Sequence, residues 1–122
     1  MATRAKPRVL VVDDDDSNRR FAERALAMEG YDVVSASSGP AALALLETEA
    51  PFDLFVIDIL MPQMAGDVLG LEIANRVPGA RILYFTGYPE RVIERGLLSN
   101  EALVEKPATL TGLLEAVSSA LD

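Results

Sequence analysis

Five short runs of aliphatic and aromatic residues alternate with longer stretches in which apolar residues recur every three or four positions. The runs cover residues 8–12, 31–36, 52–57, 81–85 and 102–105. Their hydrophobicity is nearly continuous rather than alternating, which is typical of strands that are covered on both faces, as in a parallel sheet. We therefore predict five parallel strands.

The stretches between and after the runs predict helices over 17–29, from Ser38 onward, over 65–76, over 89–98 and over 109–121. Ser38 can cap its helix, with Pro40 in the first turn, and Gly30 ends the first helix. In 109–121 the leucines and a valine lie on one stripe, which is the pattern of a helix with one buried face.

A strand–helix unit repeated five times predicts a doubly wound α/β sheet, because right-handed crossovers place helices on both faces. In such folds the functional site lies beyond the carboxyl ends of the strands. Polar residues follow four of the predicted strands at that edge, namely Asp13-Asp14, Asp58, Thr86-Gly87 and Lys106-Pro107. We expect their side chains to converge.

These residues together suit phosphoryl transfer to a carboxylate nucleophile. Clustered carboxylates ionise at low cost only beside a cation, and Mg²⁺ is a hard ion that binds oxygen ligands. Lys106 can counter the charge of Asp58 or of a phosphoryl oxygen. Thr86 offers a hydroxyl donor, and Gly87 allows the backbone to come close.

The four consecutive aspartates at 13–16 are expected to have different roles. Asp13 and Asp14 end a strand and point to the cation site. Asp15 is expected to be an ordinary loop residue. Asp16 is expected to be the N-cap of the following helix, because a carboxylate accepts hydrogen bonds from the first backbone N–H groups of a helix.

Composition and charge exclude several classes of protein. A chain of 122 residues that is 50% hydrophobic fits one domain over 1–122, with a loose tail at 1–7. Its net charge of -8 argues against direct binding to nucleic acid or an anionic membrane. The absence of cysteine and histidine excludes disulfides, thiolate catalysis and imidazole zinc sites. No stretch predicts a signal peptide or a membrane span, so we expect a cytoplasmic protein.

Four motifs occur in order along the chain: VLVVDDD, DLFVIDILMPQMAG, ILYFTG and VEKP. The set resembles the response-regulator receiver domain of two-component signalling and covers the chain from about Arg8 to Leu121. The resemblance implies a CheY-like, flavodoxin-like fold with strand order 2-1-3-4-5. It also implies a phosphoprotein of a phosphorelay that is not an enzyme beyond its own phosphorylation and dephosphorylation.

The resemblance assigns the metal and the phosphoacceptor. Asp58 would be the residue that is phosphorylated. Asp14 and Asp58 would bind Mg²⁺ directly, and Asp13 would act through water. The carbonyl of Leu60 would be the remaining protein ligand. The backbone at Leu60 and Gly87 would contact the phosphoryl group.

The resemblance also assigns the other side chains of the site. Thr86 would bind the phosphoryl group and Lys106 would pair with it. The Lys106-Pro107 peptide bond is expected to be cis. Pro62 and Gly66 match the loop that follows the phosphorylation site in the family.

One departure from the family concerns its conformational switch. Receivers usually carry Tyr or Phe three residues before the lysine, and this chain has Leu103 there. We consider the hypothesis that Tyr88, beside Thr86, takes over part of the switch, although a partly exposed loop aromatic is the simpler interpretation. Leu60 and Tyr88 also flank the place where polar side chains would orient an attacking water, which favours a long-lived phosphoryl group.

The expected partners are a sensor histidine kinase or a histidine phosphotransfer protein and a downstream protein target. A second copy of the chain is a further candidate, through the face of 89–98, 102–105 and 109–121. Two alternatives stay open. One is a pseudo-receiver that only binds partners, and the other is a haloacid-dehalogenase-like phosphatase in which Asp13 is the nucleophile and Asp15 the general acid.

Overall fold

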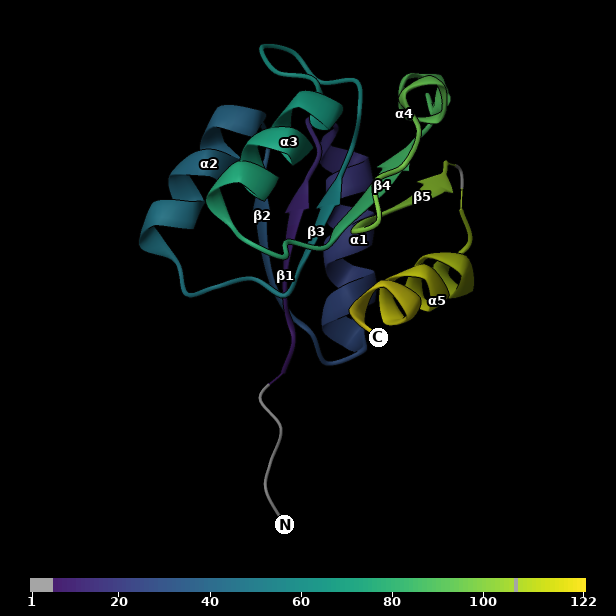
Figure 1. Ribbon diagram of the computed structural model, residues 1–122. Coiled ribbons are helices and arrows are strands. Elements are labelled where there is room, and N and C mark those ends of the chain that lie inside the picture. The colour runs from purple at the N-terminus through teal and green to yellow at the C-terminus, as the bar shows by residue number, and fades with distance from the viewer. Residues whose placement is uncertain (1–5, 107) are drawn as a thin grey trace.

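A parallel sheet with helices on both faces forms the molecule in the computed structural model, which describes residues 6–106 and 108–122 (Figure 1). Within those residues the strands are β1 (Arg8–Val12), β2 (Asp32–Ala36), β3 (Leu54–Ile57), β4 (Ile82–Thr86) and β5 (Glu101–Glu105). They pair in the order β2-β1-β3-β4-β5, and every pair is parallel. The predicted fold class and strand order are confirmed.

The helices are α1 (Asp16–Met28), α2 (Gly39–Thr48), α3 (Gly66–Arg76), α4 (Glu90–Arg95) and α5 (Leu110–Leu121). Ser38 caps α2, as predicted, by accepting a hydrogen bond from the Ala41 N–H. The helix predicted over 89–98 is shorter in the structure and ends at Arg95. Gly96 follows it with φ +86°, a left-handed conformation that glycine adopts at low cost and that ends a helix.

Both faces of the sheet are buried, which explains the continuous hydrophobicity of the strands. Alternate side chains of β1 point to opposite faces, so Leu10 and Val12 join a core under α2 and α3, whereas Val9 and Val11 join a core under α1 and α5. Tyr84 belongs to the first core, and Leu103 packs against it. Figure 1 shows these two helical layers on either side of the strands.

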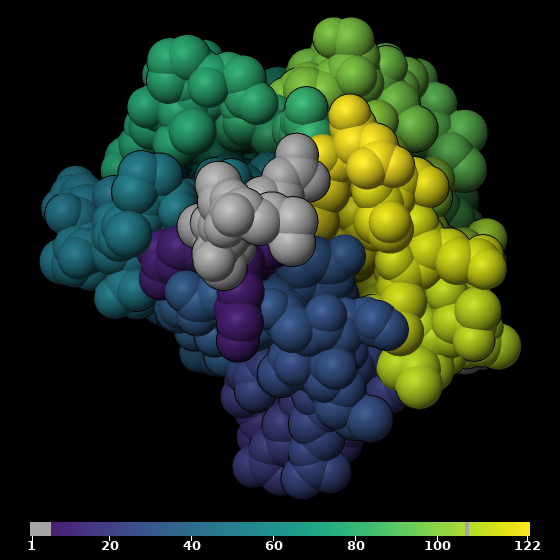
Figure 2. Space-filling model, turned by 90° about the horizontal axis from the view of Figure 1, so that it is seen from below, coloured from purple at the N-terminus to yellow at the C-terminus, as the bar shows by residue number. Residues whose placement is uncertain are grey.

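Arg8 closes the end of the sheet where the strands begin, which Figure 2 views from below. Its guanidinium pairs with Asp32 on β2 and with Glu49 after α2, each at 2.9 Å. The same group lies 4.7 Å from the centroid of the Phe52 ring. Charged contacts therefore hold together the end of the sheet where the strands begin, and the polar residues predicted for the site lie at the opposite end.

None of the helices within residues 6–106 and 108–122 has the length and the apolar character that spanning a membrane requires.

Candidate functional site

Three carboxylates meet where β1 and β3 end. One oxygen each of Asp13, Asp14 and Asp58 lies within 4.8 Å of the other two. The pairing of the strands explains this closeness, because Val12 lies beside Ile57 in the register and the Asp58 N–H donates to the Val12 carbonyl at 3.0 Å. Asp13 and Asp58 are buried, with 3% and 9% exposure, whereas Asp14 is exposed.

The Asp13 carboxylate is engaged at both oxygens. Lys106 Nζ donates to Oδ2 at 2.6 Å, and the Asp15 N–H donates to Oδ1 at 2.9 Å. Lys106 also lies 3.7 Å from Asp58 Oδ2. The structure therefore brings the predicted lysine to the site but places its ammonium nearer to Asp13 than to Asp58.

Asp58 is held in an environment that disfavours its ionised form. Burial raises its pKa most, the Lys106 ammonium lowers it, the Asp13 carboxylate raises it, and the side chain of Thr86 and the Ile59 N–H lower it. The net pKa is raised. The Ile59 N–H donates to Oδ1 at 2.8 Å, which leaves Oδ2 facing Lys106.

Gly66, at the start of α3, provides the space behind Asp58. A Cβ at this position would lie 1.8 Å from the Asp58 carbonyl oxygen and 2.9 Å from the Ile59 Cα. The Gly66 N–H donates to the Ile59 carbonyl at 2.7 Å. The match of Gly66 to the family motif therefore has a steric cause, since both neighbours are backbone.

Thr86 ends β4 with its side chain completely buried. Its Oγ1 accepts a hydrogen bond from the Tyr88 N–H at 3.0 Å, and its carbonyl accepts one from the Lys106 N–H at 2.8 Å. Gly87 is exposed, and the Tyr88 side chain is 58% exposed. Tyr88 is therefore an exposed loop aromatic in this structure, and its part in a switch stays a hypothesis.

The assignment of the helix cap within the acidic run was wrong. The N-cap of α1 is Asp15, whose Oδ1 accepts from the Asn18 N–H at 3.0 Å. Asp16 lies in the first turn, where it pairs with Arg19 at 2.5 Å. With two adjacent aspartates, a shift of one backbone residue decides which carboxylate reaches the free N–H groups.

Sequence reasoning missed Arg19. Its guanidinium donates to the Asp13 carbonyl at 2.9 Å and so ties the β1–α1 loop to the helix. Arg19 lies about one helical turn after Asp15, so the sequence places its side chain near the β1–α1 loop. The sequence does not show that its partner in this loop is the Asp13 carbonyl, because that depends on the path of the folded backbone.

The remaining predicted positions are Leu103, Leu60 and Pro107. Leu103 sits beside Tyr84 in the register of β4 and β5 and packs on the core. Leu60 follows Asp58 closely and its side chain is 44% exposed. The predicted cis bond between Lys106 and Pro107 involves a residue outside the described range.

The donors of the cluster fit a hard cation. They are carboxylate oxygens, which Mg²⁺ binds, and no nitrogen or sulfur ligand is among them. Three carboxylates gather here, and Lys106 is the cation that lies 2.6 Å and 3.7 Å from two of them, so the cluster carries surplus negative charge when its carboxylates are ionised. A bound cation would relieve that excess.

Known proteins similar to this chain include two from Brucella abortus (strain 2308). The sensor kinase CckA is 33% identical over 117 residues, which make up 93% of this chain and 12% of the kinase. The response regulator receiver protein CpdR is 37% identical over 81 residues, 66% of this chain and 67% of CpdR. The chain therefore spans about an eighth of the length of the kinase that it matches.

Solved structures with a similar fold include a CheY-like response regulator receiver domain protein from Methanospirillum hungatei JF-1. Its TM-score is 0.82 at 31% identity, covering 97% of this chain and 95% of that chain. The response regulator TrrA from Thermotoga maritima, in complex with Mg(2+)-BeF, has a TM-score of 0.80 at 29% identity, covering 93% and 98%. The sequence profile described as the response regulator receiver domain matches residues 9–118, and the chain belongs to this family of two-component systems.

Proposed function

We propose that the chain accepts a phosphoryl group on Asp58 and then changes its affinity for a partner. The observation that carries this proposal is the difference between the two buried carboxylates. Asp13 has both oxygens engaged by Lys106 and the Asp15 N–H, whereas Asp58 Oδ2 is 3.7 Å from Lys106 and is the less tightly held oxygen. Asp58 is therefore the better placed nucleophile.

Asp14 and Asp58 would bind Mg²⁺ directly, with Asp13 acting through water and the Leu60 carbonyl as a further ligand. The bound ion would neutralise charge that builds up on the phosphoryl oxygens. The all-oxygen cluster supports this assignment, as does the solved complex of the similar TrrA with Mg(2+)-BeF.

In the transfer, an Asp58 oxygen forms a bond to phosphorus while the P–N bond to the imidazole of a phosphohistidine breaks. The electron pair of that bond leaves with the imidazole nitrogen. Lys106 lies between Asp13 and Asp58, so a small rotation of its side chain brings the ammonium to a phosphoryl oxygen. The Thr86 hydroxyl would turn from the Tyr88 N–H toward another oxygen.

The chain would be no enzyme beyond its own phosphorylation and the hydrolysis of the acyl phosphate. The donor would be a sensor histidine kinase or a histidine phosphotransfer protein, and the output would be the binding of a downstream target or of a second copy. Leu60 and Tyr88 are both exposed beside the site and offer no carboxylate or amide to an attacking water, which supports slow hydrolysis. The cytoplasm remains the predicted location.

The phosphatase alternative has less support from the geometry. Its nucleophile would be Asp13, which is 3% exposed and paired with Lys106. Its general acid would be Asp15, whose carboxylate caps α1. Neither group is free for the role that this alternative requires.

Incubation with acetyl phosphate and Mg²⁺ tests the proposal and separates it from the pseudo-receiver. We expect intact-mass measurement to detect one added phosphoryl group in the wild-type chain, none in Asp58→Asn and none after removal of Mg²⁺ by a chelator. Asp15→Asn is the matched control, because asparagine also caps helices and this variant should still be labelled. An unlabelled wild-type chain would establish the pseudo-receiver instead.

A further inference from the structure

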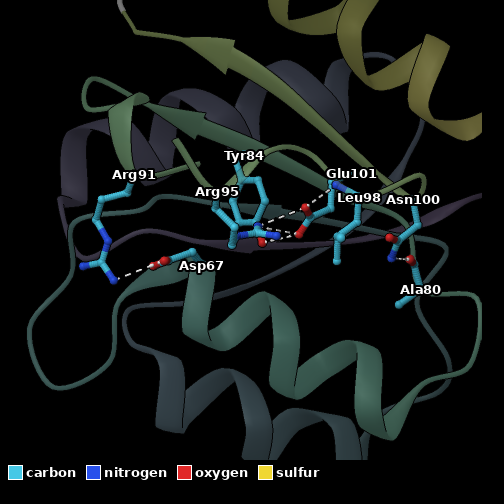
Figure 3. Close-up of polar contacts among 8 residues, drawn as sticks. All are labelled: Asp67, Ala80, Tyr84, Arg91, Arg95, Leu98, Asn100 and Glu101. Atoms are coloured by element: carbon cyan, nitrogen blue, oxygen red, sulfur yellow. Dashed lines mark hydrogen bonds and ion pairs between the residues drawn. The ribbon is translucent and has the colours of Figure 1, made fainter. Parts of the chain in front are cut away.

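The short helix α4 is held on the sheet largely by charged contacts. Of its six residues, Val92 is the one that is buried, and Ile93 is 62% exposed. Arg91 pairs with Asp67 of α3 at 3.1 Å, and Arg95 pairs with Glu101 of β5 at 3.0 Å (Figure 3). Little apolar burial therefore opposes a movement of this helix.

The contact at the end of α4 is the better satisfied of the two. The Glu101 side chain is 1% exposed, although it begins an edge strand. Its two oxygens accept hydrogen bonds from Arg95 Nη2 at 3.0 Å, from the Leu98 N–H at 2.9 Å and from Tyr84 Oη at 2.7 Å. At the start of the helix, by contrast, Asp67 Oδ1 is buried and has no hydrogen-bond partner among the described residues.

Tyr84 links this contact to the strand that carries Thr86. It is completely buried in the middle of β4, two residues before Thr86 and on the same face of the sheet. Gly70 makes room for it, because a Cβ there would lie 2.1 Å from the Tyr84 oxygen. Burial and Glu101 both raise the Tyr84 pKa, so its hydroxyl stays protonated and donates.

The position of Tyr84 also bears on Leu103, which stands where receivers usually carry Tyr or Phe. Leu103 is its direct neighbour in the register of β4 and β5 and has no polar group. A hydroxyl that could connect the sheet to α4 is therefore absent from 103 but present on the adjacent strand. Figure 3 shows Tyr84, Glu101 and Arg95 pointing toward one another between β4, β5 and α4.

We propose that Tyr84, Glu101 and Arg95 form a latch that holds α4 in its present position and sets the free energy of moving it. The coupling of this latch to the site rests on the proposed function. When the Thr86 hydroxyl turns from the Tyr88 N–H to a phosphoryl oxygen, the loop that begins α4 loses a hydrogen bond. The helix can then shift only if the contact at Glu101 strains or opens.

Hydrogen exchange measured by mass spectrometry tests the latch in the unmodified chain. Tyr84→Phe removes the hydroxyl and keeps the ring, and Glu101→Gln removes the charge. We expect amides of residues 90–98 to exchange about 5-fold faster or more in both variants, with the amides of β1 and β3 unchanged. Glu72→Gln, which makes the same change in the exposed Arg76–Glu72 pair of α3, is the matched control and should leave 90–98 as in the wild type.

Titration with beryllofluoride and Mg²⁺, as a phosphoryl mimic, tests the coupling. Because linkage is reciprocal, a weaker latch lowers the cost of the α4 shift and should raise the affinity for the mimic by about 5-fold. Unchanged exchange at 90–98, or a uniform increase over the whole sheet, would overturn the latch. Faster exchange without a change in affinity would overturn the coupling, and a wild-type chain that takes up no mimic would overturn the proposed function while the exchange result still decides the latch.

Discussion

At the scale of single residues, one lysine distinguishes two aspartates that look alike in the sequence. Lys106 bonds Asp13 at 2.6 Å and leaves Asp58 at 3.7 Å. The pKa of Asp58 is raised, first by burial and then by the Asp13 carboxylate, and the Lys106 ammonium offsets only part of this rise. The site thus holds a carboxylate whose charge is only partly compensated by the chain itself.

Asp58→Asn should therefore stabilise the chain in the absence of divalent ions. A raised pKa means that the folded state binds a proton more tightly than the unfolded state, so ionised Asp58 costs stability above its unfolded pKa. We expect urea denaturation at neutral pH with chelator to give a gain of roughly 1 kcal/mol. Mg²⁺ should stabilise the wild type more than the variant, and equal effects of Mg²⁺ on both would contradict the assigned ligand.

Gly66→Ala should disturb the backbone of the phosphoacceptor. The added methyl group would meet the Asp58 carbonyl and the Ile59 Cα, neither of which is a flexible side-chain end. We expect a loss of roughly 1–3 kcal/mol in thermal or urea unfolding, the range of overpacked cores. Gly87→Ala is the control, because nothing lies within 4 Å of a Cβ there. Equal stabilities of the two variants would contradict this expectation and would mean that the backbone at Asp58 and Ile59 moves aside at little cost.

Arg19→Ala should weaken the metal site without removing a ligand. The guanidinium holds the Asp13 carbonyl at 2.9 Å, so its loss frees the loop that carries Asp13 and Asp14. We expect Mg²⁺ affinity, measured by calorimetry, to fall by about 10-fold, as for other residues that orient metal ligands. Arg20→Ala, on the exposed side of α1, is the control. An unchanged affinity in Arg19→Ala would remove this positioning role.

At the scale of elements, the sequence predicted the strands, three of the helices and the start of α2 to within two residues. Continuous apolar runs identify strands of a two-sided sheet, and Ser38 identifies the start of α2. The end of α4 and the cap of α1 were misplaced for different reasons. Residues 96–98 are exposed and gain no apolar burial from continuing the helix, and the Leu98 N–H donates to Glu101, a contact between residues that local sequence patterns do not reveal. The cap of α1 was misplaced because Asp15 and Asp16 are adjacent and have the same capping group.

The latch at the end of α4 should respond to acid. Burial alone raises the pKa of Glu101, but hydrogen bonds from Arg95, Leu98 and Tyr84 outweigh it and the net pKa is lowered. A lowered pKa means that Glu101 stabilises the fold above its unfolded value, about 4.3, and that this contribution is lost as the pH falls through the folded value.

Glu101→Gln should therefore be less stable than the wild type by about 1–2 kcal/mol at pH 7, with the difference shrinking below about pH 4.3. Urea denaturation of both chains from pH 7 to pH 3 measures the difference. Glu72→Gln, in an exposed pair, should stay within about 0.5 kcal/mol of the wild type at every pH. A pH-independent difference for Glu101→Gln would mean that its carboxylate charge contributes nothing to the latch.

At the scale of the whole molecule, the two ends of the sheet differ in their polar groups. Arg8 and its acidic partners close the end where the strands begin, whereas acidic and hydroxyl groups and one lysine gather where the strands end. Strand order explains why residues far apart in sequence meet, since β1 lies next to β3 and β4 next to β5. The membership of the site could be predicted from that topology, but the pairing of Lys106 with Asp13 depends on side-chain distances that topology does not determine.

The most direct test of the central claim is to locate the acyl phosphate. The chain is labelled with acetyl phosphate and Mg²⁺, reduced with borohydride to convert the phosphorylated aspartate to homoserine, and mapped by peptide mass spectrometry. We expect homoserine at position 58 and nowhere else in the acidic cluster. Homoserine at position 13, or an unmodified chain under conditions that label a receiver of known activity, would contradict a phosphoacceptor at Asp58.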